Sequence, residues 1–181
     1  MSRLSLYQRA LGDRYGELPS AVQRFHGLRG SNLLQGWVET KAPASVLARG
    51  LALCLGAPHR NTRGPLRFVL DAGAQTETWT RHFPGRTMTS RMTLVAGRLE
   101  ERLGAARLTF ELVATESKLS MELVEMRFLG MPCPRWLMPQ VVAEETGTGN
   151  QLQFLVRASL QWVGTVVSYR GHLNLFNRDS A

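Results

Sequence analysis

From Gly64 nearly to its end, this chain alternates apolar and polar residues, and this pattern constrains the fold more than any other feature. Leu66, Phe68 and Leu70 occupy every second position, and later segments repeat the pattern between breaks rich in glycine and proline. Successive side chains of a β-strand point to opposite faces, so a period of two indicates strands with one buried face. The breaks divide the segment into about eight to ten strands joined by short turns.

A proline-rich segment interrupts this series between Gly130 and Pro139. Each of its three prolines lacks the amide proton that a sheet needs, so the segment cannot be a central strand. We predict a loop or a crossing segment. Trp136 and Leu137 within it are expected to fold back over one end of the sheet, and docking on a partner domain or a membrane surface is the alternative.

The N-terminal part has helical spacing instead. Residues 5–28 predict two short helices, separated by breaks at Gly12, Gly16 and Pro19. A short strand is expected over 33–41, followed by a third helix over 44–55. That helix places most of its apolar residues on one face, which we expect to pack on the sheet: Val46, Leu47, Leu51, Cys54 and Leu55.

These elements predict one domain over residues 1–181, with a helical part at 5–56 and a β-rich part at 64–176. Helices and strands do not alternate along the chain, which excludes Rossmann and TIM-barrel designs. The expected class is α+β. We predict a strongly curved, mostly antiparallel sheet or a partly closed β-barrel, with two or three N-terminal helices packed on it. Residues 177–181 are expected to form a frayed tail.

The chain is basic, with a formal net charge of +8, yet nucleic acid is not the expected partner. Of the 22 basic residues, all but Lys41 and Lys118 are arginine, and they are spread along the whole chain. A surface that binds phosphates needs these charges in a run or a stripe. The scatter argues for a general use of arginine, some of it in ion pairs.

Other patterns bear on location and on metal chemistry. No stretch reaches the roughly 18 apolar residues of a membrane-spanning helix. The charged N-terminus leaves no room for the apolar core of a signal peptide, so we expect a cytoplasmic protein. The four histidines lack ligand spacing, and Cys54 and Cys133 are far apart, so no metal site is predicted. Both cysteines are expected to be small buried hydrophobic residues.

Five segments together resemble a known family. They are SLYQRALGDRYGELPSAVQRFHG, ETWTRHFPGRTMTS, GRLEERLGAARLTFEL, FLGMPCPRWLMPQVVAEETGTG and VGTVVSYRGHL. In this order and spacing they are similar to the bacterial family called domain of unknown function 4166, over nearly the whole chain. The resemblance implies no established activity and no agreed catalytic residues.

The same resemblance implies a candidate partner. Members of that family occur alone or after an NAD(P)-dependent oxidoreductase or saccharopine-dehydrogenase-like domain. This chain lacks the glycine-rich turn that holds a dinucleotide phosphate, so we expect no cofactor in the domain itself. Any cofactor chemistry is expected to belong to an oxidoreductase partner.

One predicted strand carries an unusual charge. Trp79, Arg81 and Phe83 share a face by strict alternation, and a buried guanidinium is costly unless a carboxylate or the acidic head of a ligand pairs with it. Glu100 or Glu144 is the expected carboxylate. The alternatives are an internal ion pair without a ligand, or an arginine at the rim with its head in water.

Two functions follow from this strand. The first is binding of a hydrophobic, acidic small molecule or lipid in a pocket of the sheet, with Met88, Met92, Met121 and Met126 along the lining. The alternative is an enzyme, or an accessory substrate-handling domain, that works with a separate oxidoreductase; Glu100 or Glu144 is then the base and Tyr169 the acid. The candidate ligand-binding residues are Trp79, Arg81, Ser90, Glu100, Arg102, Glu144, Tyr169 and Arg170.

Overall fold

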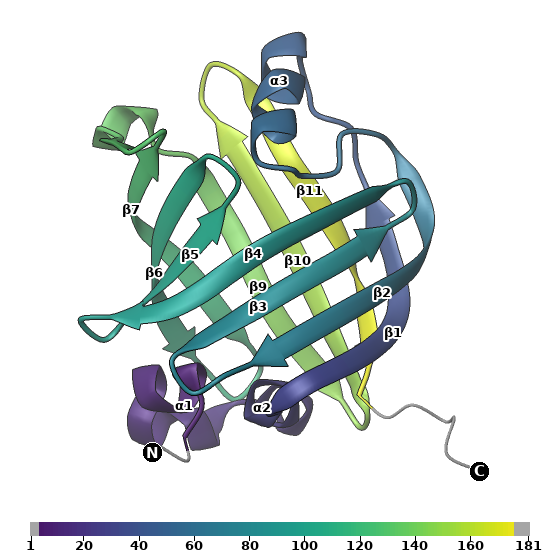
Figure 1. Ribbon diagram of the computed structural model, residues 1–181, viewed down its shortest axis with the longest axis vertical. Coiled ribbons are helices and arrows are strands. Elements are labelled where there is room, and N and C mark those ends of the chain that lie inside the picture. Colours follow the sequence, from purple (N-terminus) through teal and green to yellow (C-terminus); the bar gives the residue numbers. More distant parts are fainter. Residues whose placement is uncertain (1–3, 176–181) are drawn as a thin grey trace.

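The computed structural model describes residues 4–175, and its strands form an antiparallel β-barrel (Figure 1). The predicted tail at 177–181 lies outside the described residues. The strands, in chain order, are β1 (Gly30–Thr40), β2 (Thr62–Ala72), β3 (Thr76–Phe83), β4 (Arg86–Val95), β5 (Arg98–Leu103), β6 (Ala106–Ala114), β7 (Leu119–Phe128), β8 (Met131–Pro132), β9 (Gln140–Thr148), β10 (Gln151–Leu160) and β11 (Gly164–Asn174).

Each strand from β1 to β7 pairs with its neighbour in sequence, and β9, β10 and β11 do the same. The sheet order is β6-β5-β4-β3-β2-β1-β11-β10-β9-β7-β8, and the additional pairing of β6 with β7 closes the ring. Ten strands therefore form a closed barrel, and β8 is an extra strand on β7. The α+β class and the strongly curved antiparallel sheet are confirmed, and the closure is complete.

Two short helices, α1 (Leu6–Leu11) and α2 (Ser20–Gly27), cover one end of the barrel, which we call the helix end (Figure 1). A 3₁₀ segment, Gly12–Glu17, joins them. Helix α1 begins with a capping box, in which Ser5 and Gln8 bond each other's backbone amides, so its first orphan donors are satisfied. The buried face of α2, which includes Phe25, fills this end of the interior.

The opposite end, which we call the loop end, is formed by the connections 41–61, 84–85, 104–105, 129–139 and 161–163. Helix α3 (Val46–Cys54) lies there, and so does a 3₁₀ turn, Arg135–Leu137 (Figure 1). No helix among residues 4–175 is long and apolar enough to cross a membrane.

Helix α3 packs on the barrel through a face that only partly matches the one predicted: Leu51 and Leu55 pack against the core as expected. Ala48 and Ala52 are fully buried, whereas Val46, Leu47 and Cys54 are exposed. Hydrogen bonds at the start of the helix set its orientation: the Ser45 hydroxyl caps the helix and also donates to the Val163 carbonyl at 2.9 Å. Close packing through the two alanines turns Val46 and Leu47 outward, so the expectation was wrong for these two residues and for a buried Cys54.

The proline-rich segment is a loop, as predicted, with the two-residue strand β8 and one 3₁₀ turn within it. Trp136 does not fold back over the barrel, because its side chain is 73% exposed. Leu137 is exposed as well. The expectation that this tip covers the end of the sheet was therefore wrong.

Candidate functional site

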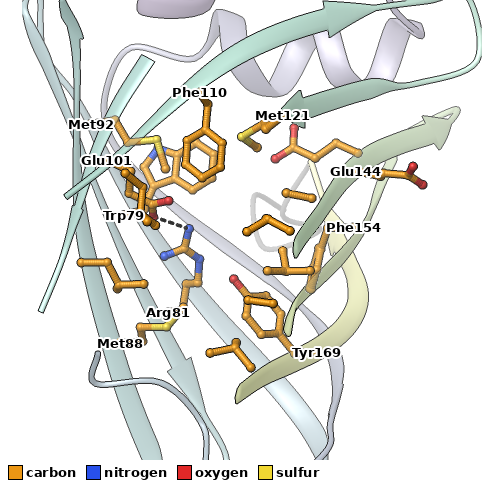
Figure 2. Close-up of a pocket in the computed structure, with 18 of the residues that line it drawn as sticks. Trp79, Arg81, Met88, Met92, Glu101, Phe110, Met121, Glu144, Phe154 and Tyr169 are labelled. Atoms are coloured by element: carbon orange, nitrogen blue, oxygen red, sulfur yellow. Dashed lines mark ion pairs between the residues drawn. The ribbon is translucent and has the colours of Figure 1, made fainter. Parts of the chain in front are cut away.

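A cavity of about 120 Å³ lies inside the barrel, and its lining is almost entirely apolar. Phe25 of α2 lines it at the helix end, and Leu55 and Pro139 line it at the loop end, so it follows the barrel axis. All four methionines expected along a pocket are part of this lining: Met88, Met92, Met121 and Met126. Figure 2 shows the cavity with some of the side chains that line it.

Arg81 is the cationic side chain of this lining, and it is buried, with 6% of its surface exposed. Alternation along β3 turns Trp79, Arg81 and Phe83 into the barrel, as the period of two predicts. The Nη1 atom donates to the Ser90 hydroxyl on β4 at 3.0 Å. The guanidinium also lies over the rings of Trp79 and Phe68, at 5.0 and 5.7 Å from their centroids.

The carboxylate nearest to Arg81 is that of Glu101, and the expectation of Glu100 or Glu144 was wrong. Its Oε1 lies 3.9 Å from Arg81 Nη2, too far for a hydrogen bond (Figure 2). Glu101 and Leu103 of β5 line the cavity, and Glu100 between Leu99 and Glu101 does not. Glu100 lies on the other face of β5, where it is buried under two arginines: its Oε1 lies 3.3 Å from Arg102 Nε and 3.6 Å from Arg107 Nε.

Two further predicted site residues lie away from the cavity centre. Glu144 pairs with Lys118 at 2.6 Å, and its carboxylate points away from the other labelled side chains (Figure 2). Arg170 lies on the outer surface and binds Glu39 through Nε and Nη2 at 3.0 and 2.8 Å. The structure thus brings together Trp79, Arg81, Ser90 and Tyr169, and it places Glu100, Arg102 and Arg170 outside the barrel wall. Glu100, Glu144 and Tyr169 do not converge in one cleft.

Tyr169 of β11 supplies a second polar group to the cavity. Its ring packs edge-on against Phe83 and Phe154, at centroid distances of 5.2 and 6.0 Å. Burial raises the pKa of its hydroxyl, and the nearby Arg81 partly opposes that shift. Within residues 4–175 the hydroxyl makes no hydrogen bond, and Figure 2 shows it directed into the same space as the Arg81 side chain.

Comparison with known families accounts for most of the chain. The model of one family, domain of unknown function (DUF4166), matches residues 18–173. The chain belongs to this family. The resemblance noted in the sequence is thereby confirmed. No curated protein matches the DUF4166 domain described here.

Among solved structures, this DUF4166 domain is similar to the crystal structure of Rv2717c from M. tuberculosis. The two share 12% sequence identity with a TM-score of 0.44. The match covers 88% of this chain and 99% of that chain.

The DUF4166 barrel also contains a buried carboxylate that the sequence reading missed. Glu77 is 2% exposed and accepts a hydrogen bond from Trp79 Nε1 at 3.2 Å. Burial raises the pKa of Glu77, and the charge of His26 partly opposes this. Because Glu77 has the same parity as Trp79 and Arg81 on β3, extending the alternation by one step would have found it.

A buried pair of a histidine and a glutamate lies at the helix end, and nothing in the sequence indicated it. His26 Nε2 lies 2.5 Å from Glu145 Oε2, and the ring of Tyr7 stacks on that of His26 at 3.5 Å. Nδ1 of His26 is buried without a hydrogen-bond partner in the described part of the chain. Tyr7, Phe25 and His26 close the helix end of the cavity with an aromatic layer.

No group of three or more histidine, cysteine, aspartate or glutamate side chains within the described residues is arranged to hold a metal ion.

Proposed function

We propose that this domain binds a slender hydrophobic monocarboxylic acid inside the barrel, with its head group at Arg81 and its tail toward the loop end. One observation carries the proposal, namely a buried guanidinium with free donors that faces an apolar cavity. Small-molecule sites commonly combine an apolar lining with a few polar groups that fix the orientation of the ligand.

The hydrogen bonds of Arg81 leave room for such a head group. A guanidinium has five N–H donors, and among the described residues only the bond to Ser90 uses one. Burying a charge without full compensation is costly, so a ligand that accepts these donors gains affinity. A carboxylate can accept two parallel N–H bonds from arginine, and the Tyr169 hydroxyl is a further donor for it.

Glu101 restricts the class of head group. Its carboxylate lies near enough to Arg81 to repel an anion placed beside the guanidinium. A head with a single negative charge, shared over two oxygens, suffers less repulsion than a doubly charged phosphate. This favours a monocarboxylate.

The lining defines the tail. Toward the loop end the cavity is bounded by Phe83, Met88, Leu103, Val156 and Val167, without a charged group among them. A volume of about 120 Å³ is small for a ligand pocket, so a long alkyl tail fits only if the path widens. The methionines, which are flexible, can change rotamer to widen the path.

The proposal is tested by binding and extraction. We expect organic extraction and mass spectrometry of the purified protein to release a fatty acid. In calorimetry, a series from octanoate to palmitate should bind, and Arg81→Leu should weaken acid binding by about 10- to 100-fold, the loss expected for a charged hydrogen-bond anchor. The methyl esters, which lack the charge, should lose much less.

Arg67→Leu is the matched control, because Arg67 is exposed on β2 and points away from the interior. It should bind every acid as the wild type does. If neither the acids nor their esters bind to the unaltered protein, the barrel interior is only a core and the proposal fails.

A further inference from the structure

The loop end exposes an unusual amount of apolar surface. The six most exposed large hydrophobic side chains of the described residues all lie there, each between 62% and 89% exposed. They are Val46, Leu47, Leu129, Met131, Trp136 and Trp162. Apolar side chains gathered in this way on a folded domain indicate a surface that contacts something else.

These side chains come from three segments that hydrogen bonds join. Ser45, at the start of α3, donates to the carbonyl of Val163 beside Trp162. At the other end of α3, the Cys54 carbonyl accepts from the Ala105 amide at 3.2 Å. Ala105 in turn accepts from the Leu129 amide at 2.9 Å. Helix α3, the β10–β11 turn and the proline-rich loop therefore form one surface around the end of the barrel (Figure 1), which we call the loop-end surface.

Charge on this surface has one sign. The connections 41–61, 84–85, 104–105, 129–139 and 161–163 contain no aspartate or glutamate. Lys41, Arg49, Arg60 and Arg135 in them are all exposed. The helix end, in contrast, has carboxylates in its connections, such as Asp13 and Glu116.

Exposed tryptophans beside cations match the interface of an anionic bilayer. Tryptophan favours the level of the lipid head groups, and each lysine or arginine near an anionic leaflet adds to the attraction. A second copy of this chain fits poorly, because two such surfaces would bring like charges together without a carboxylate to offset them.

We propose that the loop-end surface docks reversibly on anionic phospholipid bilayers, with Trp136 and Trp162 inserted at the head-group level and the cations against the lipid phosphates. Leu55 and Pro139, which line the cavity, lie at the same end, so docking brings the barrel interior close to the lipid. The inference does not depend on what occupies the cavity.

Vesicle co-sedimentation tests this. The unaltered protein should bind vesicles made of equal amounts of phosphatidylglycerol and phosphatidylcholine, bind pure phosphatidylcholine weakly, and dissociate as salt rises, because screening weakens surface charge attraction. Two double variants of the loop-end surface test the contacts: Trp136→Ser with Trp162→Ser removes both tryptophans, and Arg49→Glu with Arg135→Glu reverses two charges. Each should lower the partition coefficient of the protein into anionic vesicles about tenfold or more.

Matched controls lie on the barrel wall. Trp37→Ser removes a half-exposed tryptophan of β1, and Arg67→Glu reverses an exposed charge of β2. Both should bind vesicles like the wild type, and so should Arg81→Leu, which separates this proposal from the one on ligand binding. The inference is overturned if the unaltered protein does not bind anionic vesicles. It is also overturned if Trp37→Ser and Arg67→Glu weaken vesicle binding as much as the substitutions on the loop-end surface do. The inference is also overturned if the protein does not bind vesicles but forms a dimer in ultracentrifugation that the substitutions on the loop-end surface dissociate.

Discussion

Glu77 is the residue at which burial and ionisation conflict most directly in this barrel. Its carboxylate is 2% exposed, and burial is the largest cause that raises its pKa above the ordinary value of 4.5. The folded state therefore binds the proton of Glu77 more tightly than the unfolded state does. The stability that this preference contributes is complete below the unfolded pKa, and it is lost as the pH rises through the folded pKa.

Glu77→Gln should remove this pH dependence. Glutamine stays neutral at every pH, and its carbonyl oxygen can still accept the hydrogen bond from Trp79 Nε1. We expect the variant to gain stability relative to the wild type as the pH rises from about 4 to about 8, measured by urea unfolding at a series of pH values. Glu116→Gln, on an exposed turn, is the control for loss of a carboxylate as such. A stability difference that stays constant with pH would contradict the assignment.

For single residues, the sequence predicts which face of a strand a side chain occupies when the apolar positions of that strand alternate clearly. Trp79, Arg81 and Ser90 face inward as alternation requires, whereas Glu100 was assigned the wrong face. Leu99 and Leu103 are the apolar residues of β5, and a spacing of two from them identifies Glu101 as the carboxylate that points inward. The contact between His26 and Glu145 joins residues 119 positions apart, so no local pattern could have indicated it.

Strands β1 and β11 approach each other closely through two glycines. A Cβ atom on Gly171 would lie 2.0 Å from the Trp37 carbonyl oxygen, and one on Gly36 would lie 1.8 Å from that of His172. Any side chain at these positions forces the two strands apart. This pairing joins the first strand of the barrel to the last, so its geometry matters to the whole ring.

Gly171→Ala is expected to lower the free energy of unfolding by about 1–3 kcal/mol, the usual cost of overpacking, because backbone has to move. Gly50→Ala is the control: a Cβ at Gly50 in α3 meets no atom within 4 Å. That substitution should raise stability by up to about 1 kcal/mol, since alanine favours a helix. Equal urea midpoints for Gly171→Ala and the wild type would show that the strands adapt without strain.

Elements differ in how far the sequence predicts them. Most strands were predictable because they alternate and because most of the turns that end them contain glycine or proline; the turn at 115–118 contains neither. The third helix was predictable in its existence, but its packing face only in part. A helical pattern shows which residues are apolar, whereas the fit of Ala48 and Ala52 against the barrel depends on close approach in three dimensions.

For the molecule as a whole, closure was the step that the sequence left open. Alternation is the same in an open curved sheet and in a barrel, and the contacts that close this ring join distant strands. One seam of the ring is short: β7 and β9 pair only at Leu119 with Glu145 and at Ser120 with Glu144. Beyond these pairs β7 and β9 share no ladder, and β8 takes up that edge of β7 only at Arg127 and Phe128. Both strands line the cavity, so we expect the ligand to enter through the gap between these two pairings.

An entrance at this seam predicts a distinctive pattern of amide exchange. Successive amides of an antiparallel strand point to opposite neighbours, and between Met121 and Glu125 strand β7 is paired with β6 but not with β9. Hydrogen exchange followed by NMR should therefore show slow and fast amides in alternation along this stretch, interrupted at Val124, where the register with β6 shifts. Strand β2, paired with both β1 and β3 over Arg67–Ala72, should be slow at every amide there. Uniformly slow exchange in β7 would mean that the seam is sealed, and the ligand would then have to enter between the connections of the loop end.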